Sequence, residues 1–174
     1  MYRSLRLLSH STAETMAIGA AVALQLRVGD VVVLVGDLGG GKTAFVRGAV
    51  AALGSSDPVS SPTFAIAHEY RAQVPIVHID CYRIQRAQEM FDIGIEDLIN
   101  AQTIAFVEWG DLIRTLLGDS YLEIAFELLS GPDDGPDDRV LRVTNHGAQW
   151  CDRLALIEAA CIRADDGDHG ELVP

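Results

Sequence analysis

The sequence predicts a single α/β domain with a mostly parallel central sheet and antiparallel additions. The first indication is that residues 30–36 (DVVVLVG) and 103–109 (TIAFVEW) are apolar runs without polar alternation, typical of strands buried on both faces of a parallel sheet. The second is that strand and helix patterns alternate through the first part of the chain. The third is a closely spaced pair of strand patterns at 121–129 and 139–145, which predicts an antiparallel hairpin.

The N-terminal elements are a short strand and a buried helix. Residues 4–8 (SLRLL) predict the strand, and residues 10–26 predict a helix capped by Ser11 or Thr12. The apolar stretch at 16–24 (MAIGAAVAL) is too short to span a bilayer. We therefore interpret it as part of a buried helix.

The next two elements flank a glycine-rich loop. Residues 30–36 predict the buried strand that precedes the loop. In residues 42–54 the apolar side chains recur at helical spacing, and Gly54 is suited to end that helix. A polar loop with two prolines follows at 55–64.

The rest of the chain continues the alternation of strands and helices. Residues 64–70 (FAIAHEY) alternate apolar and polar side chains, as a half-buried strand does. The sequence contains no internal repeat and no interdomain linker. The remaining predicted elements are strands at 75–80 and 103–109, the hairpin strands given above, and helices at 87–100 (with a break near Gly94), 111–117 and about 149–163.

The net charge of −12 is unevenly distributed along the 174 residues. Residues 131–138 (GPDDGPDD) and 164–174 contain eight of the 25 acidic residues and no lysine or arginine, so the remainder carries 17 acidic and 13 basic residues. Such a surface offers no basic footprint for DNA, RNA or an anionic membrane. We expect residues 1–163 to form the domain, with 131–138 as a solvated acidic insert and 164–174 as a disordered acidic tail. The three cysteines lack metal-ligand spacing, which predicts reduced thiols and a cytoplasmic protein.

The glycine-rich loop, residues 36–43 (GDLGGGKT), satisfies the pattern G-x-x-x-x-G-K-[ST] between a buried strand and a helix. Glycines let backbone N–H groups approach a phosphate chain, and the helix start adds its positive dipole end. Lys42 is the only lysine in the chain, and its compact ammonium suits the β- and γ-phosphates better than a planar guanidinium does. The predicted fold is therefore a P-loop NTPase-like three-layer domain. The residues expected to bind the nucleotide here are Gly36, Asp37, Leu38, Gly39, Gly40, Gly41, Lys42 and Thr43, with the Thr43 hydroxyl also offered to Mg²⁺.

Two acidic residues end predicted strands. Glu108 ends the strand at 103–109 and Asp80 ends the strand at 75–80, at the edge where open α/β sheets bind ligands. We expect one carboxylate to hold Mg²⁺, directly or through water, and the other to orient an attacking water, with Lys42 as the third catalytic residue. The alternative for each is an exposed acid at a strand end.

Four further residues have two interpretations each. Thr63, in SSPTF, is either a switch-loop threonine that reaches the nucleotide or Mg²⁺, or a turn residue. Trp109 either gates the site or packs in the core. His78 is a core strand histidine or a hydrogen-bond partner near Asp80, and Arg83 either holds a carboxylate or phosphate or forms a surface salt bridge.

Five motifs occur in order along the chain: GDLGGGKT, SPTF, HIDCYR, MFDIGIEDL and VEWGD. Together, over about residues 5–145, they resemble the TsaE (also called YjeE) family, the bacterial ATPases of tRNA threonylcarbamoyladenosine synthesis. Gly40 departs from the family, which usually has Ala there. The acidic insert and the tail are not covered by the resemblance.

The resemblance implies an ATPase that uses ATP and Mg²⁺. We expect it to be slow alone and stimulated by partner proteins, because the arginine nearest the motifs, Arg83, is poorly placed to reach the γ-phosphate. The implied partners are TsaD and TsaB, of which TsaD transfers the threonylcarbamoyl group to adenosine in certain tRNAs. The tRNA would be reached only through these partners. By the same resemblance Lys42 and Thr43 would bind phosphate and Mg²⁺, Asp80 and Glu108 would form the Mg²⁺ and catalytic pair with Trp109 beside them, and Thr63 would belong to a switch-like loop.

Two other functions share the loop. A small-molecule kinase is the first, because RIQR (83–86) imitates an arginine-rich lid, but the sequence shows no larger lid or acceptor pocket. A GTP-dependent switch is the second. Its guanine-reading N-K-x-D signature needs a lysine, and the only lysine already lies in the loop.

Overall fold

The computed structural model describes residues 3–60, 66–84, 89, 92, 94–110 and 114–165. The strands form one seven-stranded sheet in the order β1-β7-β6-β2-β5-β4-β3. Their bounds are β1 (Ser4–Ser9), β2 (Val31–Gly36), β3 (Ala67–Tyr70), β4 (Ile76–Asp80), β5 (Ile104–Glu108), β6 (Tyr121–Leu128) and β7 (Arg139–His146). The helices are α1 (Thr12–Ala23), α2 (Lys42–Ala52), α4 (Ile95–Leu98), α5 (Arg114–Leu117) and α6 (Cys151–Asp165), with a 3₁₀ turn at Ala148–Trp150 before α6.

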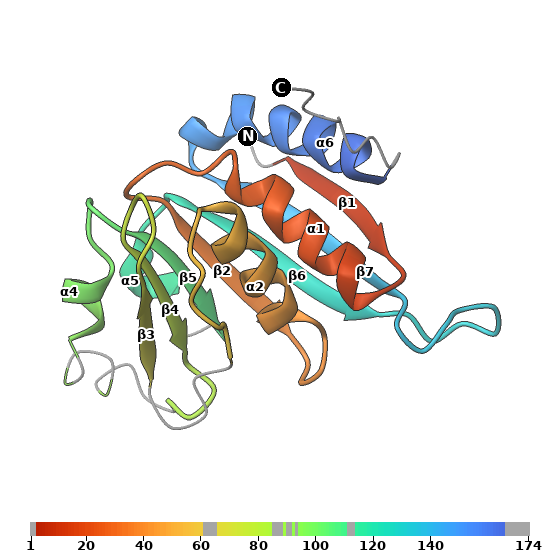
Figure 1. The fold of residues 1–174 in the computed structure, drawn as a ribbon, viewed down its shortest axis with the longest axis horizontal. Coiled ribbons are helices and arrows are strands. Elements are labelled where there is room, and N and C mark those ends of the chain that lie inside the picture. The colour runs from red at the N-terminus through yellow and green to blue at the C-terminus, as the bar shows by residue number, and fades with distance from the viewer. Residues whose placement is uncertain are drawn as a thin grey trace.

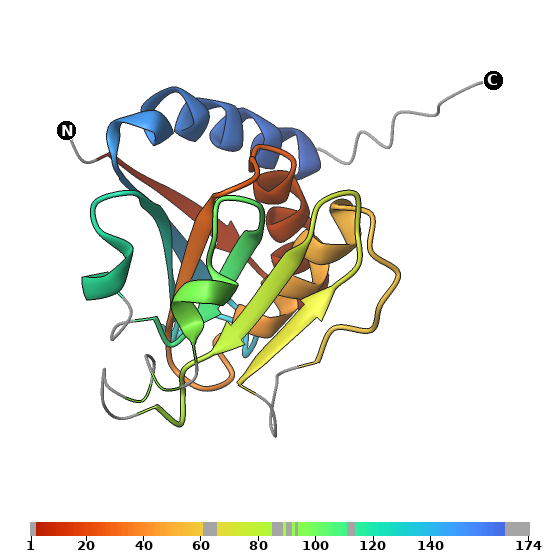
Figure 2. The ribbon, with the colours of Figure 1, turned by 90° about the vertical axis from the view of Figure 1, so that its left-hand side faces the viewer.

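The sheet is parallel at its centre and antiparallel at both sides. Strands β6, β2, β5 and β4 are parallel neighbours, whereas β7 runs antiparallel to both β6 and β1, and β3 runs antiparallel to β4. Helices α1, α2 and α6 lie on one face of the sheet, and the short helices α4 and α5 lie toward the other (Figures 1 and 2). The predicted three-layer α/β fold with antiparallel additions is confirmed.

The central strand β2 is buried on both faces, which explains why its sequence has no polar alternation. Val32 and Leu34 pack into the core under α1 and α2, while Val31, Val33 and Val35 pack into the core on the opposite face. Both neighbours of β2 are parallel strands, so neither face nor edge of it meets solvent.

Helix α1 packs closely against α2 and so fixes the helix that follows the glycine-rich loop. A Cβ atom on Gly19 would lie 2.2 Å from the carbonyl oxygen of Phe45, and a Cβ on Gly48 would lie 1.9 Å from that of Met16. Only glycine allows this approach at both positions. The start of α1 is capped as predicted, because the Ser11 side chain accepts a hydrogen bond from the backbone of the first turn.

Helix α6 is anchored by a buried arginine. Arg153 forms an ion pair with Asp30, just before β2, and its guanidinium lies 3.8 Å from the centre of the Trp150 ring. Trp150 is fully buried.

Within the described residues, no helix combines the length and apolar character that crossing a membrane would require.

The helix predicted at 87–100 is confirmed where the structure describes it. Glu89 and Asp92 are helical, and α4 follows Gly94, whose φ of +72° marks the predicted break. Residues 85–88, 90, 91 and 93 of that prediction lie outside the described residues.

The cysteines are free thiols, as predicted. Burial raises the pKa of Cys81 to about 12 and that of Cys161 to about 11, so both thiols are protonated packing groups at neutral pH.

Candidate functional site

The glycine-rich loop connects the end of β2 to the start of α2. Gly41, which precedes α2, has a φ of +106°, and a Cβ there would lie 2.5 Å from Nη1 of Arg139. The left-handed backbone favours glycine at this position, and a larger residue would also displace the Arg139 guanidinium. In the described structure no side chain caps α2, so the N–H groups of its first turn can serve an anion.

Lys42 is buried in this loop, with 4% of its surface exposed. Its Nζ donates hydrogen bonds to the carbonyl oxygens of Gly36 (2.6 Å) and Asp37 (2.7 Å), and it lies 3.9 Å from the centre of the Trp109 ring. Burial lowers the pKa of the ammonium, while nearby carboxylates, chiefly Glu108, act in the opposite direction. The single lysine of the chain is thus held at the floor of the loop.

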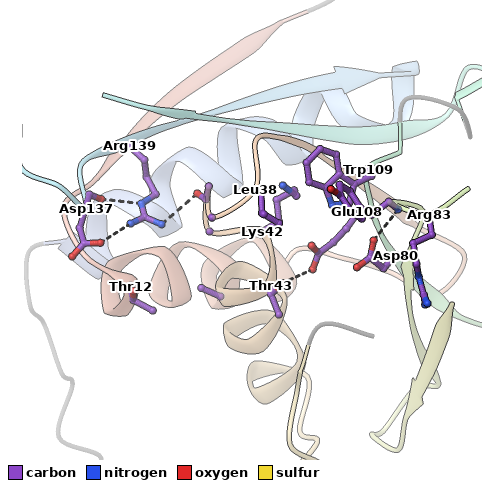
Figure 3. A pocket seen from close by; sticks show the side chains of 15 residues that line it. Thr12, Leu38, Lys42, Thr43, Asp80, Arg83, Glu108, Trp109, Asp137 and Arg139 are labelled. Atoms are coloured by element: carbon purple, nitrogen blue, oxygen red, sulfur yellow. Dashed lines mark hydrogen bonds and ion pairs between the residues drawn. The ribbon is translucent and has the colours of Figure 1, made fainter. Parts of the chain in front are cut away.

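The two predicted acids lie side by side at the same edge of the sheet. Asp80 and Glu108 are partners in the parallel register of β4 and β5. Thr43, in the first turn of α2, donates its hydroxyl hydrogen to Oε1 of Glu108 at 2.9 Å, and Asp80 Oδ1 accepts the backbone N–H of Tyr82 at 2.9 Å (Figure 3). The structure therefore brings the loop threonine and both carboxylates together.

A buried histidine lies behind Glu108. His78 Nε2 is 2.9 Å from Glu108 Oε1, and its Nδ1 is 3.4 Å from the hydroxyl oxygen of Tyr70. The interpretation of His78 as a core histidine is confirmed, because it has no exposed surface, and its partner is Glu108. Burial, with a smaller contribution from Glu108, raises the pKa of Tyr70.

Trp109 has an unusual backbone conformation. Its φ of +58° makes it the one non-glycine residue with positive φ in the described part of the chain. Its N–H donates to the Leu34 carbonyl at 2.9 Å, and its ring lies between the Lys42 ammonium and the Tyr82 ring, whose centre is 4.9 Å away. A left-handed backbone costs about 1–2 kcal/mol, so contacts with the loop and sheet must hold Trp109 in place.

A cavity of about 540 Å³ follows the loop, a size typical of small-molecule sites. Figure 3 shows Glu108, Asp80 and Trp109 toward one end, and Thr12, Asp137 and Arg139 toward the other. The lining residues are Thr12, residues 38–44, Asp80, Tyr82, Arg83, Glu108, Trp109, Asp137 and Arg139.

Arg139 contacts the glycine-rich loop at the end of the cavity that Thr12 and Asp137 also line. It is the first residue of β7 and is buried. Its Nη1 donates to the Gly40 carbonyl at 3.3 Å, its Nε donates to the Asp137 carbonyl at 2.9 Å, and its Nη2 lies 3.3 Å from the Asp137 carboxylate. The guanidinium thus ties the glycine-rich loop to the hairpin between β6 and β7.

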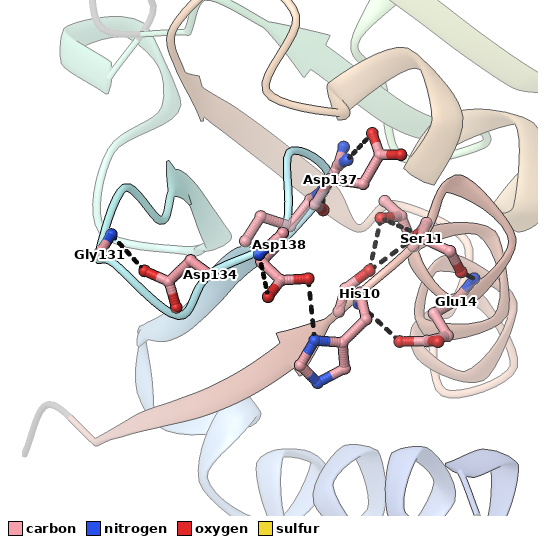
Figure 4. Close-up of polar contacts among 11 residues, drawn as sticks. His10, Ser11, Glu14, Gly131, Asp134, Asp137 and Asp138 are labelled. Atoms are coloured by element: carbon pink, nitrogen blue, oxygen red, sulfur yellow. Dashed lines mark hydrogen bonds and ion pairs between the residues drawn. The ribbon is translucent and has the colours of Figure 1, made fainter.

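The acidic insert at 131–138 is largely exposed, as predicted, but its end is fixed to the domain. Asp138 Oδ1 lies 3.0 Å from Nδ1 of His10, and Oδ2 accepts the Gly135 N–H at 2.9 Å (Figure 4). These contacts, the Gly135 N–H first, lower the pKa of Asp138. The insert is therefore attached beside the start of α1, which carries Thr12.

Comparison with known proteins identifies the family of this chain. The sequence profile described as Threonylcarbamoyl adenosine biosynthesis protein TsaE matches residues 9–132, which include the loop and both carboxylates. The chain belongs to the TsaE family. The family predicted from the five motifs is thereby confirmed.

Curated relatives and a solved structure agree with this assignment. The tRNA threonylcarbamoyladenosine biosynthesis protein TsaE of Bacillus subtilis is 36% identical over 146 residues, covering 82% of this chain and 88% of that protein. Its namesake in Treponema pallidum is 32% identical over 126 residues, covering 72% of this chain and 93% of that protein. The crystal structure of Bacillus subtilis YdiB has a TM-score of 0.71 at 30% identity, covering 95% of this chain and 98% of that chain.

The predicted site residues of this TsaE-family protein fall into three groups. Residues 38–43, Asp80, Glu108 and Trp109 line the cavity. Gly36 and Asp37 instead supply carbonyl oxygens to Lys42. Thr63 lies outside the described residues, so its predicted role in a switch loop stays a prediction.

The sequence did not indicate five of the cavity residues: Thr12, Ala44, Tyr82, Asp137 and Arg139. Asp137 was assigned to the solvated insert, and Thr12 was considered only as a helix cap. The one sequence signal for Arg139 is its position directly after an aspartate-rich segment, a pattern that by itself indicates a surface residue.

One end of the cavity carries Thr43, Asp80 and Glu108 and is called the phosphate end, after the phosphates that the loop is predicted to bind. The donor atoms at this end suit Mg²⁺. They are one hydroxyl, of Thr43, and the carboxylates of Glu108 and Asp80, all hard oxygen ligands. The described residues hold no cluster of three or more His, Cys, Asp or Glu side chains that could bind a metal alone. Mg²⁺ in proteins is typically held by one or two carboxylates, with phosphate oxygens and water completing its shell.

Proposed function

We propose that the protein is a Mg²⁺-dependent ATPase that acts in tRNA threonylcarbamoyladenosine synthesis together with TsaD and TsaB. The observation that carries the ATPase assignment is the hydrogen bond from Thr43 of the loop to Glu108, next to Asp80. The names of the relatives support the pathway. Work on tRNA would place the protein in the cytoplasm.

The loop would bind the phosphates of ATP. The N–H groups in the first turn of α2, at the positive end of the helix dipole, would donate to the phosphates. Lys42, in the same turn, would add the positive charge of its ammonium. Phosphate oxygens would replace the Gly36 and Asp37 carbonyls as acceptors for the Lys42 ammonium. Because Lys42 itself is buried, its contacts with the phosphates would be stronger than they would be in solvent.

The two carboxylates would divide the remaining work. Glu108 is hydrogen-bonded to the loop threonine, so we assign Thr43 and Glu108 to holding Mg²⁺. When bound, Mg²⁺ would neutralise charge that develops on the phosphoryl oxygens. Asp80 occupies the adjacent strand end and is less buried, so we assign it to accepting a hydrogen bond from the attacking water and orienting it.

The rim of the cavity suits a partner protein. Leu38 and Tyr82 line the cavity with 76% and 59% of their surfaces exposed, and the Tyr82 ring packs at a tilt against Trp109. Exposed apolar side chains beside a site are typical of a protein interface. A partner bound there would exclude water and could supply a further charge, which for P-loop enzymes is worth about 10³–10⁵ in rate.

The test is ATP turnover by the protein alone, with TsaD and TsaB, and with substrate tRNA added. We expect slow turnover alone and marked stimulation by the partners. Glu108→Gln keeps the size of the side chain but removes its charge, so stimulated turnover should fall by about 10² or more while ATP still binds. Glu127→Gln, in an exposed pair with Arg142 on the hairpin, is the matched control and should change nothing.

Two results would overturn parts of this proposal. ATP binding without turnover in the complete mixture would exclude the ATPase, whatever the pathway. Turnover that is fast in the protein alone and unchanged by TsaD and TsaB would exclude the partner-completed site.

A further inference from the structure

His78 occupies a position in the sheet from which it can control Glu108. Side chains alternate along a strand, so His78 and Asp80 of β4 share one face, as do Phe106 and Glu108 of β5. The register pairs His78 with Phe106 and Asp80 with Glu108. His78 therefore lies diagonally across from Glu108 on the face that α2 covers, and its Nε2 reaches Oε1 at 2.9 Å.

Glu108 accepts two hydrogen bonds on one of its two carboxylate oxygens. A carboxylate only accepts, so both Thr43 Oγ1 and His78 Nε2 donate to the same oxygen, Oε1. No described residue donates to the other oxygen, Oε2. Two donors on one oxygen fix the rotation of the carboxylate and leave its second oxygen for a ligand at the cavity.

Tyr70 in turn fixes the histidine. The Tyr70 hydroxyl oxygen lies 3.4 Å from Nδ1, and this nitrogen is an acceptor in the tautomer that donates from Nε2 to Glu108. The two rings are stacked with their centres 6.2 Å apart. Both residues are buried, so water does not compete for these contacts.

We propose that His78 is a positioning residue for the nucleotide-bound Mg²⁺ site: it holds the Glu108 carboxylate so that Oε2 faces the cavity. The inference rests on the proposed function, because it assigns Glu108 to the metal. Residues that orient a metal ligand by hydrogen bonding to it, without touching the metal, typically contribute about 10–100-fold to metal affinity or activity. A histidine that served only the fold would contribute to stability alone.

A matched pair of variants separates these roles. His78→Gln can place its amide nitrogen near the position of Nε2 and still donate to Glu108, whereas His78→Met has similar bulk and no donor. We measure nucleotide affinity without metal, Mg²⁺ affinity in the presence of a non-hydrolysable ATP analogue, and kcat and KM for ATP with the partner proteins. His78→Met should lower Mg²⁺ affinity and kcat by about tenfold or more, with metal-free nucleotide affinity unchanged, and His78→Gln should recover most of both losses.

Equal Mg²⁺ affinity in wild type and His78→Met would overturn the proposal, and so would equal losses in the Met and Gln variants. If wild type hydrolyses no ATP, the proposed ATPase fails, but the Mg²⁺ titration still decides the role of His78. If His78→Met does not fold, Tyr70→Phe replaces it, because it removes only the hydroxyl beside Nδ1. That variant should lower Mg²⁺ affinity measurably, and an unchanged value would overturn the proposal.

Discussion

The two ends of the cavity are built in different ways. At the phosphate end, the carboxyl ends of the parallel strands β4 and β5 and the first turn of α2 converge, so Thr43, Asp80 and Glu108 meet through the register of the sheet. At the opposite end, a single side chain, Arg139, reaches from the start of β7 to the Gly40 carbonyl. One end is fixed by the topology of the core, and the other by one buried cation.

This difference predicts different responses to substitution. The phosphate end combines several charged groups in one cluster. Removing one of these charges should therefore abolish the step that it serves, either nucleotide binding or turnover. Arg139 acts on the loop through neutral carbonyl oxygens and one aspartate, so removing it should weaken binding by degrees. The predictions below test whether the two ends differ in this way.

The largest effect is expected for Lys42→Ala. Without the ammonium, ATP·Mg²⁺ should no longer stabilise the protein, whereas in wild type a ligand at about 100 times its Kd adds roughly 2.7 kcal/mol. For a chain of this size that is a rise in Tm of about 5–10 °C, which differential scanning fluorimetry measures. Arg47→Ala, on the same helix but hydrogen-bonded to the Val59 carbonyl outside the cavity, is the control. Equal thermal shifts in wild type and Lys42→Ala would remove the basis for a phosphate site.

The sequence predicted the phosphate end because its determinants are local. The β2–loop–α2 pattern lies within one short segment, and acids at the ends of parallel strands meet without further information about packing. The same rule predicts that Asp80 and Glu108 lie side by side, and the register of β4 and β5 confirms it.

The sequence could not predict the Arg139 end, because burial of a charged side chain depends on partners far along the chain. Arg139 and Gly40 are 99 positions apart. The contacts among Tyr70, His78 and Glu108 were missed for the same reason, since they depend on the register of three strands.

A smaller, graded effect is expected for Arg139→Met. The Gly40 carbonyl would lose its donor, so we expect nucleotide affinity to fall by about 5–30-fold and the free energy of unfolding by about 1–3 kcal/mol. Isothermal titration calorimetry and urea unfolding give the two values. Arg142→Met on the same strand is matched in chemistry but sits in an exposed pair with Glu127, and should change stability by less than about 0.5 kcal/mol. Complete loss of ATP binding in a folded Arg139→Met would mean that this end is as indispensable as the phosphate end.

The smallest effect on affinity, and the most direct view of the loop, is expected for Trp109→Phe. The Lys42 ammonium lies 3.9 Å from the centre of the Trp109 ring, and binding phosphate would redirect that charge. Tryptophan emission should therefore change when ATP is added to wild type. The change should disappear in Trp109→Phe and persist in Trp150→Phe, because Trp150 is fully buried against Arg153 and is not among the cavity residues.

Affinity itself should differ little in Trp109→Phe. Phenylalanine keeps a ring beside the lysine, and a cation–π contact at a partly exposed site is worth about 0.5–1 kcal/mol, so Kd measured by calorimetry should change by no more than about fivefold. An emission change that survives in Trp109→Phe would have to come from Trp150, the other tryptophan of the chain. That result would contradict the prediction that Trp109 senses the movement of the Lys42 charge.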